Sequence, residues 1–116
     1  MELTQSDAQK IRTVIERQIA AFLQDDFSLA FSQAAPGIQI QFGTATNFVR
    51  RMESAYPSVH RPRSVVFESL RMIQEVPSQQ VILMDQSGEL IRATYTMQKQ
   101  QNNSWKIAGC YLTPMG

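Results

Sequence analysis

The chain is poor in the residues on which many protein chemistries depend. Its 116 residues include one cysteine, Cys110, and one histidine, His60. A single cysteine cannot form an internal disulfide, which fits a reducing compartment. Metal sites need several such ligands close together, so we expect no bound metal. The chain also lacks a glycine-rich phosphate loop and a nucleophile elbow, and we expect no cofactor.

Charge is scarce as well. Charged residues make up 18% of the chain, and the formal net charge is +1. Nucleic-acid binding depends on a strong basic excess, and binding to acidic membranes does too, so we expect neither partner. No stretch approaches the ~20 apolar residues that span a bilayer. Residues 1–5 lack the basic start of a signal peptide, so we expect a cytoplasmic protein.

What the chain does contain is enough for one domain. Hydrophobic residues make up 43% of it. A chain of this length buries roughly two-thirds of its unfolded surface, which is sufficient for a core. No linker, repeat or low-complexity tract divides the sequence, and we predict a single domain over residues 1–116.

The first half of the chain, residues 1–56, has the spacing of helices. Its longest apolar stripe recurs at intervals of three and four residues from Ile11 to Leu23. This spacing predicts one long helix with a single buried face. Thr4 or Ser6 is suited to cap the start of this helix.

Two shorter helices are predicted after the long one. The aspartates at 25–26 precede the first and can accept hydrogen bonds from its free N–H groups. The second begins at Thr44 or Thr46 and stops before Pro57. Between these helices, residues 38–42 alternate between apolar and polar, which predicts a short strand or an extended connector.

The second half, residues 63–113, has the two-residue period of strands. The apolar run 81–84 predicts a strand covered on both faces, and Gly88 lies in a predicted hairpin turn. The last strand is predicted to place these residues on one face: Trp105, Ile107, Gly109 and Tyr111, against Lys106, Ala108, Cys110 and Leu112. We therefore predict an α+β fold, with three N-terminal helices packed on a curved antiparallel sheet of about four strands.

Several segments together resemble a known family. They are the helical opening, Asp25-Asp26, Ala34-Ala35-Pro36, Phe42-Gly43, Phe48, Tyr56-Pro57, Arg61-Pro62-Arg63 and the strand from Trp105 to Cys110. The chain is similar over nearly its whole length to an uncharacterised bacterial domain-of-unknown-function family. That family is placed in the nuclear transport factor 2-like superfamily, also called the cystatin-like roll. The resemblance implies a cone of helices on a curved sheet, often with an apolar pocket at its open end.

The resemblance does not decide the function. Members of the superfamily include isomerases, dehydratases, polyketide cyclases and many non-catalytic binding or dimerising domains, so fold alone is no guide. Enzymes of this kind usually place an aspartate or a histidine inside the cone. Here the aspartates at 25–26 fit helix caps better, and Glu68 fits an outward, solvated position. His60 has no carboxylate nearby in sequence to orient it, so no catalytic residue is assigned.

Arg61 and Arg63 are the best functional candidates. They flank Pro62, and residues two apart in an extended segment point the same way. With Tyr56 and His60 nearby in sequence, the two guanidinium groups could clamp a carboxylate or a phosphate. The structural alternative, which we favour slightly, is that the arginines pair with acidic residues and hold the third helix to the sheet.

Aromatic residues and methionines supply a second set of candidates. Trp105, Tyr111, Tyr95, Phe67 and the methionines could line a pocket for a small apolar or anionic ligand, or could simply form the core. The predicted ligand-binding residues are Tyr56, His60, Arg61, Arg63 and Trp105. A neutral outer sheet face with Thr94, Thr96 and Gln98 predicts a homodimer paired through that face.

These observations leave two classes of function. The first is a non-catalytic module that binds a small molecule or a protein. The second is a small lyase or isomerase that acts on an apolar anionic substrate inside the cone. The absence of an obvious buried acid or base favours the first. An accessory structural role stays open, and so does the question of whether the cone is hollow.

Overall fold

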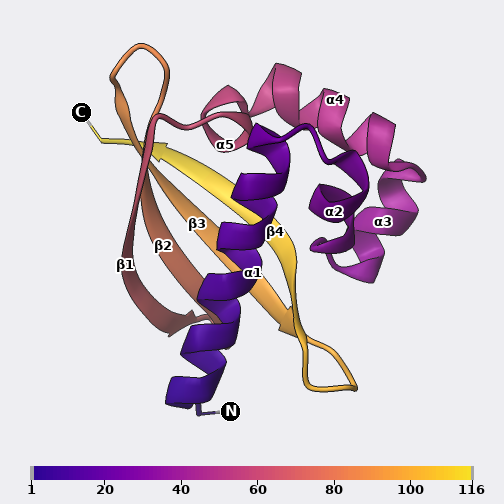
Figure 1. The fold of residues 1–116 in the computed structure, drawn as a ribbon. Helices are drawn as coiled ribbons and strands as arrows, with labels where there is room; N and C mark the ends of the chain where they lie inside the picture. The colour runs from indigo at the N-terminus through magenta and orange to yellow at the C-terminus, as the bar shows by residue number, and fades with distance from the viewer. Residues whose placement is uncertain (1, 116) are drawn as a thin grey trace.

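Helices and sheet form two layers in the computed structural model, which describes residues 2–115. The helices lie on one face of a four-stranded antiparallel sheet of order β1-β2-β3-β4 (Figure 1). The predicted α+β class and the antiparallel sheet are confirmed. The elements are α1 (Gln5–Leu23), α2 (Phe27–Ser32), α3 (Pro36–Phe42), α4 (Ala45–Ala55), α5 (Pro57–His60), β1 (Ser64–Ile73), β2 (Val76–Met84), β3 (Leu90–Lys99) and β4 (Trp105–Pro114).

The long helix α1 starts at a reciprocal cap. The Thr4 hydroxyl accepts from the Asp7 backbone N–H, and the Asp7 carboxylate accepts from the Thr4 N–H, both at 3.0 Å. These bonds satisfy N–H groups that a helix start leaves free. The Trp105 indole N–H also donates to Asp7 at 3.3 Å, which ties the start of α1 to β4. The apolar stripe of α1, including Ile11 and Ile15, is buried against the sheet as predicted.

The prediction of three helices is wrong, because the described part of the chain forms five. Residues 38–42 belong to helix α3 and form neither a strand nor a connector. Ile38 and Phe42 are four residues apart, so they share a helix face as readily as a strand face. Pro36 occupies the first turn of α3, where its fixed φ favours a helix start. The amide of Gln39 then donates to the Ala34 carbonyl at 2.9 Å and holds α3 to the preceding turn.

The fifth helix, α5, follows Pro57. This proline ends α4 as predicted, but it also occupies the first position of the next helix. Tyr56 joins the two helices in a non-helical conformation, with φ of −134° and ψ of 59°. Ser58, Val59 and His60 are all buried, so this short helix contributes to the core.

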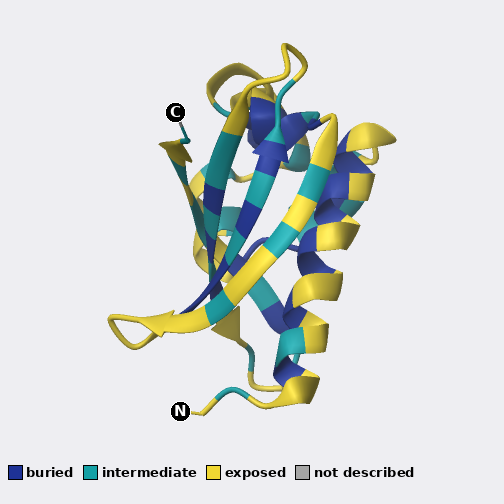
Figure 2. Ribbon diagram, turned by 90° about the vertical axis from the view of Figure 1, so that its left-hand side faces the viewer, coloured by how far each residue is buried: buried dark blue, intermediate teal, exposed yellow. Residues whose placement is uncertain are grey.

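The sheet has one covered face and one open face. Along β2 and β3 the inward residues Val81, Leu83, Ala93 and Tyr95 are wholly buried. Ile82, between two of them, keeps partial exposure, so the prediction that residues 81–84 are covered on both faces is wrong. Figure 2 shows the alternation as bands of different burial along the strands.

A bulge in β4 changes which residues face the helices. Thr96 pairs with Gly109, whereas its neighbour Met97 pairs with Ile107, so Ala108 is the extra residue. Trp105 and Ile107 are buried, as one predicted face requires. Beyond the bulge, the alternation of inward and outward side chains along β4 is the reverse of the predicted one. Cys110 then pairs with buried Tyr95, and Tyr111 is 65% exposed, so the predicted faces of β4 are correct only before the bulge.

Within residues 2–115, no helix combines the length and the apolar character that crossing a membrane requires.

Candidate functional site

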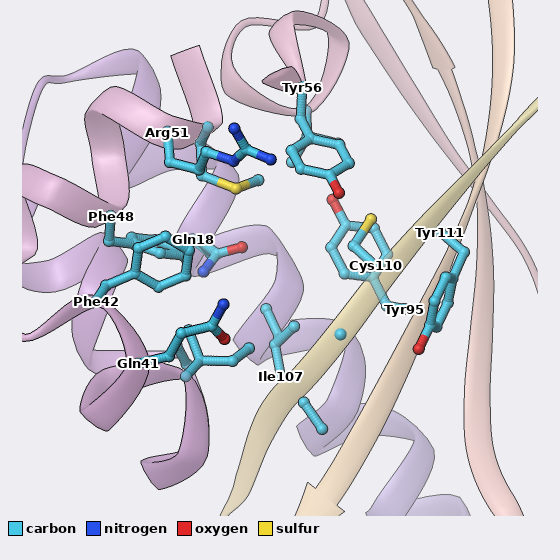
Figure 3. A pocket seen from close by; sticks show the side chains of 16 residues that line it. Gln18, Gln41, Phe42, Phe48, Arg51, Tyr56, Tyr95, Ile107, Cys110 and Tyr111 are labelled. Carbon is cyan, nitrogen blue, oxygen red and sulfur yellow. The ribbon is translucent and has the colours of Figure 1, made fainter. Parts of the chain in front are cut away.

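A pocket of about 270 Å³ lies between the helical layer and β4. Its walls come from α1, α3, α4, the α4–α5 junction, β3 and β4, and Figure 3 shows the side chains that line it. The β4 residues of the wall start at Ile107 and continue through the bulge to Tyr111. The pocket therefore depends on the bulge, which places Cys110 opposite the inward-facing Tyr95.

One wall of the pocket is apolar. Phe42 from α3 and Phe48 from α4 pack edge to face at 5.6 Å between ring centroids, and Met52 continues this wall one turn along α4. Ile107 faces them from β4. Aromatic and aliphatic walls of this kind are typical of sites for small molecules.

Tyr95 is the unusual residue of the pocket. It is wholly buried on β3, and its hydroxyl is the only buried side-chain polar atom in residues 2–115 that has no hydrogen-bond partner. Burial, and to a smaller extent the neighbouring Cys110, raise the pKa of Tyr95 well above its usual range. The phenol is therefore neutral at physiological pH and is available as a donor.

Two further polar groups face the pocket beside Tyr95. Cys110 sits across the strand pair from Tyr95, and burial raises the pKa of its thiol to about 12. Gln18 from α1 donates its amide N–H to the Ala30 carbonyl at 3.1 Å. Figure 3 shows the amide oxygen of Gln18 turned toward the pocket.

The mouth of the pocket carries its only charge. Among the lining residues, Arg51 of α4 is the one charged side chain. Within the described residues no carboxylate lies within 4.0 Å of its guanidinium. Tyr56 and Gln41 lie beside the same opening, and Figure 3 shows the Arg51 guanidinium pointing toward Tyr56. The pocket thus combines apolar walls, a buried free donor and a cation.

Of the five predicted ligand-binding residues, the structure places only Tyr56 in this pocket. Trp105 lies at the other end of β4, where it is buried, bonded to Asp7 and covered by the Lys99 ammonium at 5.9 Å. A role for Trp105 in binding stays a prediction. In the fold, its role is to join α1 to the sheet.

The two arginines of the predicted clamp, Arg61 and Arg63, contact different parts of the fold. Arg61 forms an ion pair with Asp25 at 2.6 Å and donates to the Leu23 carbonyl at 3.4 Å, so it binds the end of α1. Arg63 is exposed, and its guanidinium lies near Gly88 in the β2–β3 turn. The two side chains meet different neighbours, and the pairing of Arg61 matches the structural alternative.

His60 is a core residue. It is 6% exposed and packs against Phe22 with ring centroids 5.6 Å apart. Burial, and then the charge of Arg61, lower its pKa below the usual value. His60, Arg61 and Arg63 do not line the pocket described above, and their binding of a ligand stays a prediction.

The acidic candidates also lie outside the pocket. Asp26 caps α2 by accepting from the Leu29 N–H at 3.1 Å, which confirms the predicted cap. Glu68 is exposed and forms an ion pair with Arg92 at 2.9 Å. The hydrogen bond from Arg92 lowers the pKa of Glu68. In residues 2–115, no three His, Cys, Asp or Glu side chains gather into a group that could hold a metal ion.

Sequence reasoning missed Gln18 and Arg51. Gln18 could have been found, because it interrupts the apolar stripe of α1 between Ile15 and Ile19, and it is 3% exposed. A polar residue on a buried face needs a partner, and this requirement is a signal of its own. Arg51 has no such signal, since its neighbours in sequence give no reason to expect a pocket.

Comparison with known proteins adds a family but no activity. A family model described as "Domain of unknown function (DUF4864)" matches residues 4–115. No curated protein and no solved structure matches the chain. The resemblance to the nuclear transport factor 2-like superfamily therefore stays a prediction.

Proposed function

The chain belongs to this family of unknown function, and we propose that it binds a small molecule in the pocket between the helices and β4. The observation that carries the proposal is the Tyr95 hydroxyl, which is wholly buried and without a partner. Leaving a buried donor unpaired costs about 1–3 kcal/mol, and phenylalanine would avoid that cost. A ligand that accepts a hydrogen bond from Tyr95 removes the penalty.

The volume of the pocket sets the size of the ligand. A cavity of about 150 Å³ holds benzene, so a pocket of about 270 Å³ takes roughly ten to twelve non-hydrogen atoms. The walls favour an apolar body, and the polar groups at Tyr95, Gln18 and Arg51 favour an oxygen-bearing substituent. A helical layer and a sheet around one apolar pocket also support our proposal of a nuclear transport factor 2-like cone.

The chemistry of the walls favours binding over catalysis. Lyases and isomerases of this kind need a base near the substrate. The lining residues include no aspartate, glutamate or histidine. The Cys110 thiol, with a pKa raised to about 12, stays protonated at physiological pH and is a poor nucleophile. We therefore propose a non-catalytic binding module.

The proposal is tested by NMR titration of the ¹⁵N-labelled protein with small aromatic acids and amides. We expect shifts at the amides of Tyr95, Cys110 and Gln18. Ala108→Phe places a ring at the exposed bulge of the pocket wall, and we expect it to abolish these shifts while the rest of the spectrum is kept. Shifts that survive Ala108→Phe, or that map to the outer face of the sheet, would contradict the proposal.

A further inference from the structure

The ligand's charge follows from the groups around the pocket mouth, and this step rests on the proposed function. We propose that the ligand is a small apolar monocarboxylate, bound with its carboxylate between Arg51 and Tyr95 and its apolar body against Phe42 and Phe48. Nothing in the family assignment indicates a ligand of any class.

The first argument is the unbalanced charge of Arg51. The lining residues contain this one cation and no acid. In the described part of the chain, the four ion pairs involve other residues, and the Arg51 guanidinium donates no hydrogen bond. A cation that has no counter-ion and lies above an apolar pocket favours the binding of an anion at that position.

The position of Arg51 on α4 explains how it reaches the pocket. Phe48 and Met52 form the buried face of this helix, and Arg51 lies next to that face, three residues after Phe48 and one before Met52. Its side chain therefore runs along the edge of the apolar wall and keeps its charged end at the opening. Arg50, its neighbour, does not line the pocket and is exposed.

The second argument is that a carboxylate satisfies both polar groups at once. In Figure 3 the Arg51 guanidinium and the hydroxyls of Tyr56 and Tyr95 are turned toward the same part of the pocket. One carboxylate oxygen can accept from the Tyr95 hydroxyl, and the other can accept from Arg51. The buried donor gains its partner, and the guanidinium gains its counter-charge.

A phosphate fits these groups less well. It carries a charge of about −1.5 to −2 at neutral pH and three acceptor oxygens. The pocket offers one cation, with Tyr56 and Gln41 as its neutral neighbours at the mouth. A single charge on a planar group is what one guanidinium matches best. The described residues therefore select a carboxylic acid of roughly ten to twelve non-hydrogen atoms.

The test compares three probes of nearly equal size by calorimetric titration: 3-phenylpropanoate, 3-phenylpropanamide and 3-phenylpropylamine. We expect the wild-type protein to bind the acid about tenfold more tightly than the amide, because the hydrogen bond from Arg51 is charge-assisted. The cationic amine should bind more weakly than both. Arg51→Gln should lower the affinity for the acid to that for the amide and leave the amide unchanged.

Arg50→Gln is the matched control, because it removes the same charge from the same helix outside the pocket. It should keep the preference for the acid. Equal affinity for acid and amide in the wild-type protein, or an equal loss in both arginine variants, would overturn the carboxylate proposal while binding in the pocket stands. If none of the three probes shifts the pocket amides, the proposed function fails and this inference fails with it.

Discussion

In the described residues, every fully buried side-chain nitrogen or oxygen atom except one has a hydrogen-bond partner. Gln18 bonds to the Ala30 carbonyl, and Gln79 donates to the Gln80 carbonyl at 3.0 Å. Asp7 accepts from Thr4 and Trp105. Only the fully buried Tyr95 hydroxyl has no partner among the described residues. Because folding penalises such groups, this residue is the strongest sign that the pocket takes a ligand.

The reactivity of the Cys110 thiol tests whether this group is buried. Burial raises the pKa of its thiol to about 12. At pH 8 we expect iodoacetamide to alkylate it roughly a hundredfold or more slowly than an exposed thiol, because the thiolate is scarce. Mass spectrometry of a time course gives the rate. A rate equal to that of the urea-unfolded protein would show that the thiol is not buried as described.

The buried His60 predicts a pH dependence of stability near neutral pH. Its pKa is lowered in the folded protein, chiefly by burial, so the unfolded state binds the proton more readily below about pH 6.5. The contribution of His60 to the free energy of unfolding should therefore be complete at pH 7.5. It should be lost progressively as the pH is lowered to 5. The pKa values of the Asp7, Glu68 and Asp85 carboxyl groups are also lowered. These groups change the stability at lower pH than His60 does.

The control for this dependence is His60→Gln, which cannot titrate. Urea unfolding at pH 7.5 and pH 5 should show a smaller difference between the two pH values in the variant than in the wild type. The absolute stability of the variant is not the readout, because His60 also packs on Phe22. An equal decline in both proteins would show that His60 is not responsible.

Among the elements, β4 determines which side chains of the sheet face the pocket. Its bulge at Ala108 brings Cys110 to the inner face and leaves Gly109 and Tyr111 on the outer face. Outside the bulge, a β carbon added at Gly109 would lie 2.9 Å from the Thr96 Oγ1 and 3.7 Å from the Tyr111 ring. The glycine is therefore required by close packing of two strands.

Gly109→Ala should lower the free energy of unfolding by about 1–3 kcal/mol, because Thr96 is β-branched and cannot turn away freely. Adding Thr96→Ala removes the Oγ1 and should restore most of the loss, whereas Thr96→Ala alone should have a small effect. Urea denaturation of the four proteins measures the coupling. Additive effects in the double variant would refute the contact.

The elements also show where sequence reasoning succeeds and where it stops. The stripe from Ile11 and the cap at Thr4 predicted α1, since both signals are local. The residues 38–42 fit two periods at once, and only packing against α4 selects the helix. The bulge at Ala108 depends on pairing with β3, which no local pattern specifies. The pocket joins α4 to β4, so its residues could not be grouped from the sequence.

At the scale of the whole molecule, the helices cover one face of the sheet and leave the other open. Val66, 56% exposed, and Tyr111, 65% exposed, lie on that open face beside Thr94 and Thr96. A homodimer through this face stays a prediction. Light scattering after size exclusion should give twice the chain mass for the wild type and one chain mass for Tyr111→Lys. A monomeric wild type would contradict it.

The most direct test of the whole account is the stability of Tyr95→Phe with and without 3-phenylpropanoate. Without the ligand, the variant should be at least as stable as the wild type toward urea, because it loses an unpaired donor. With the ligand, it should gain less stability than the wild type, because stabilisation follows affinity. A Tyr95→Phe protein that is clearly less stable alone, yet gains as much from the ligand, would show that the hydroxyl serves the fold and not the ligand.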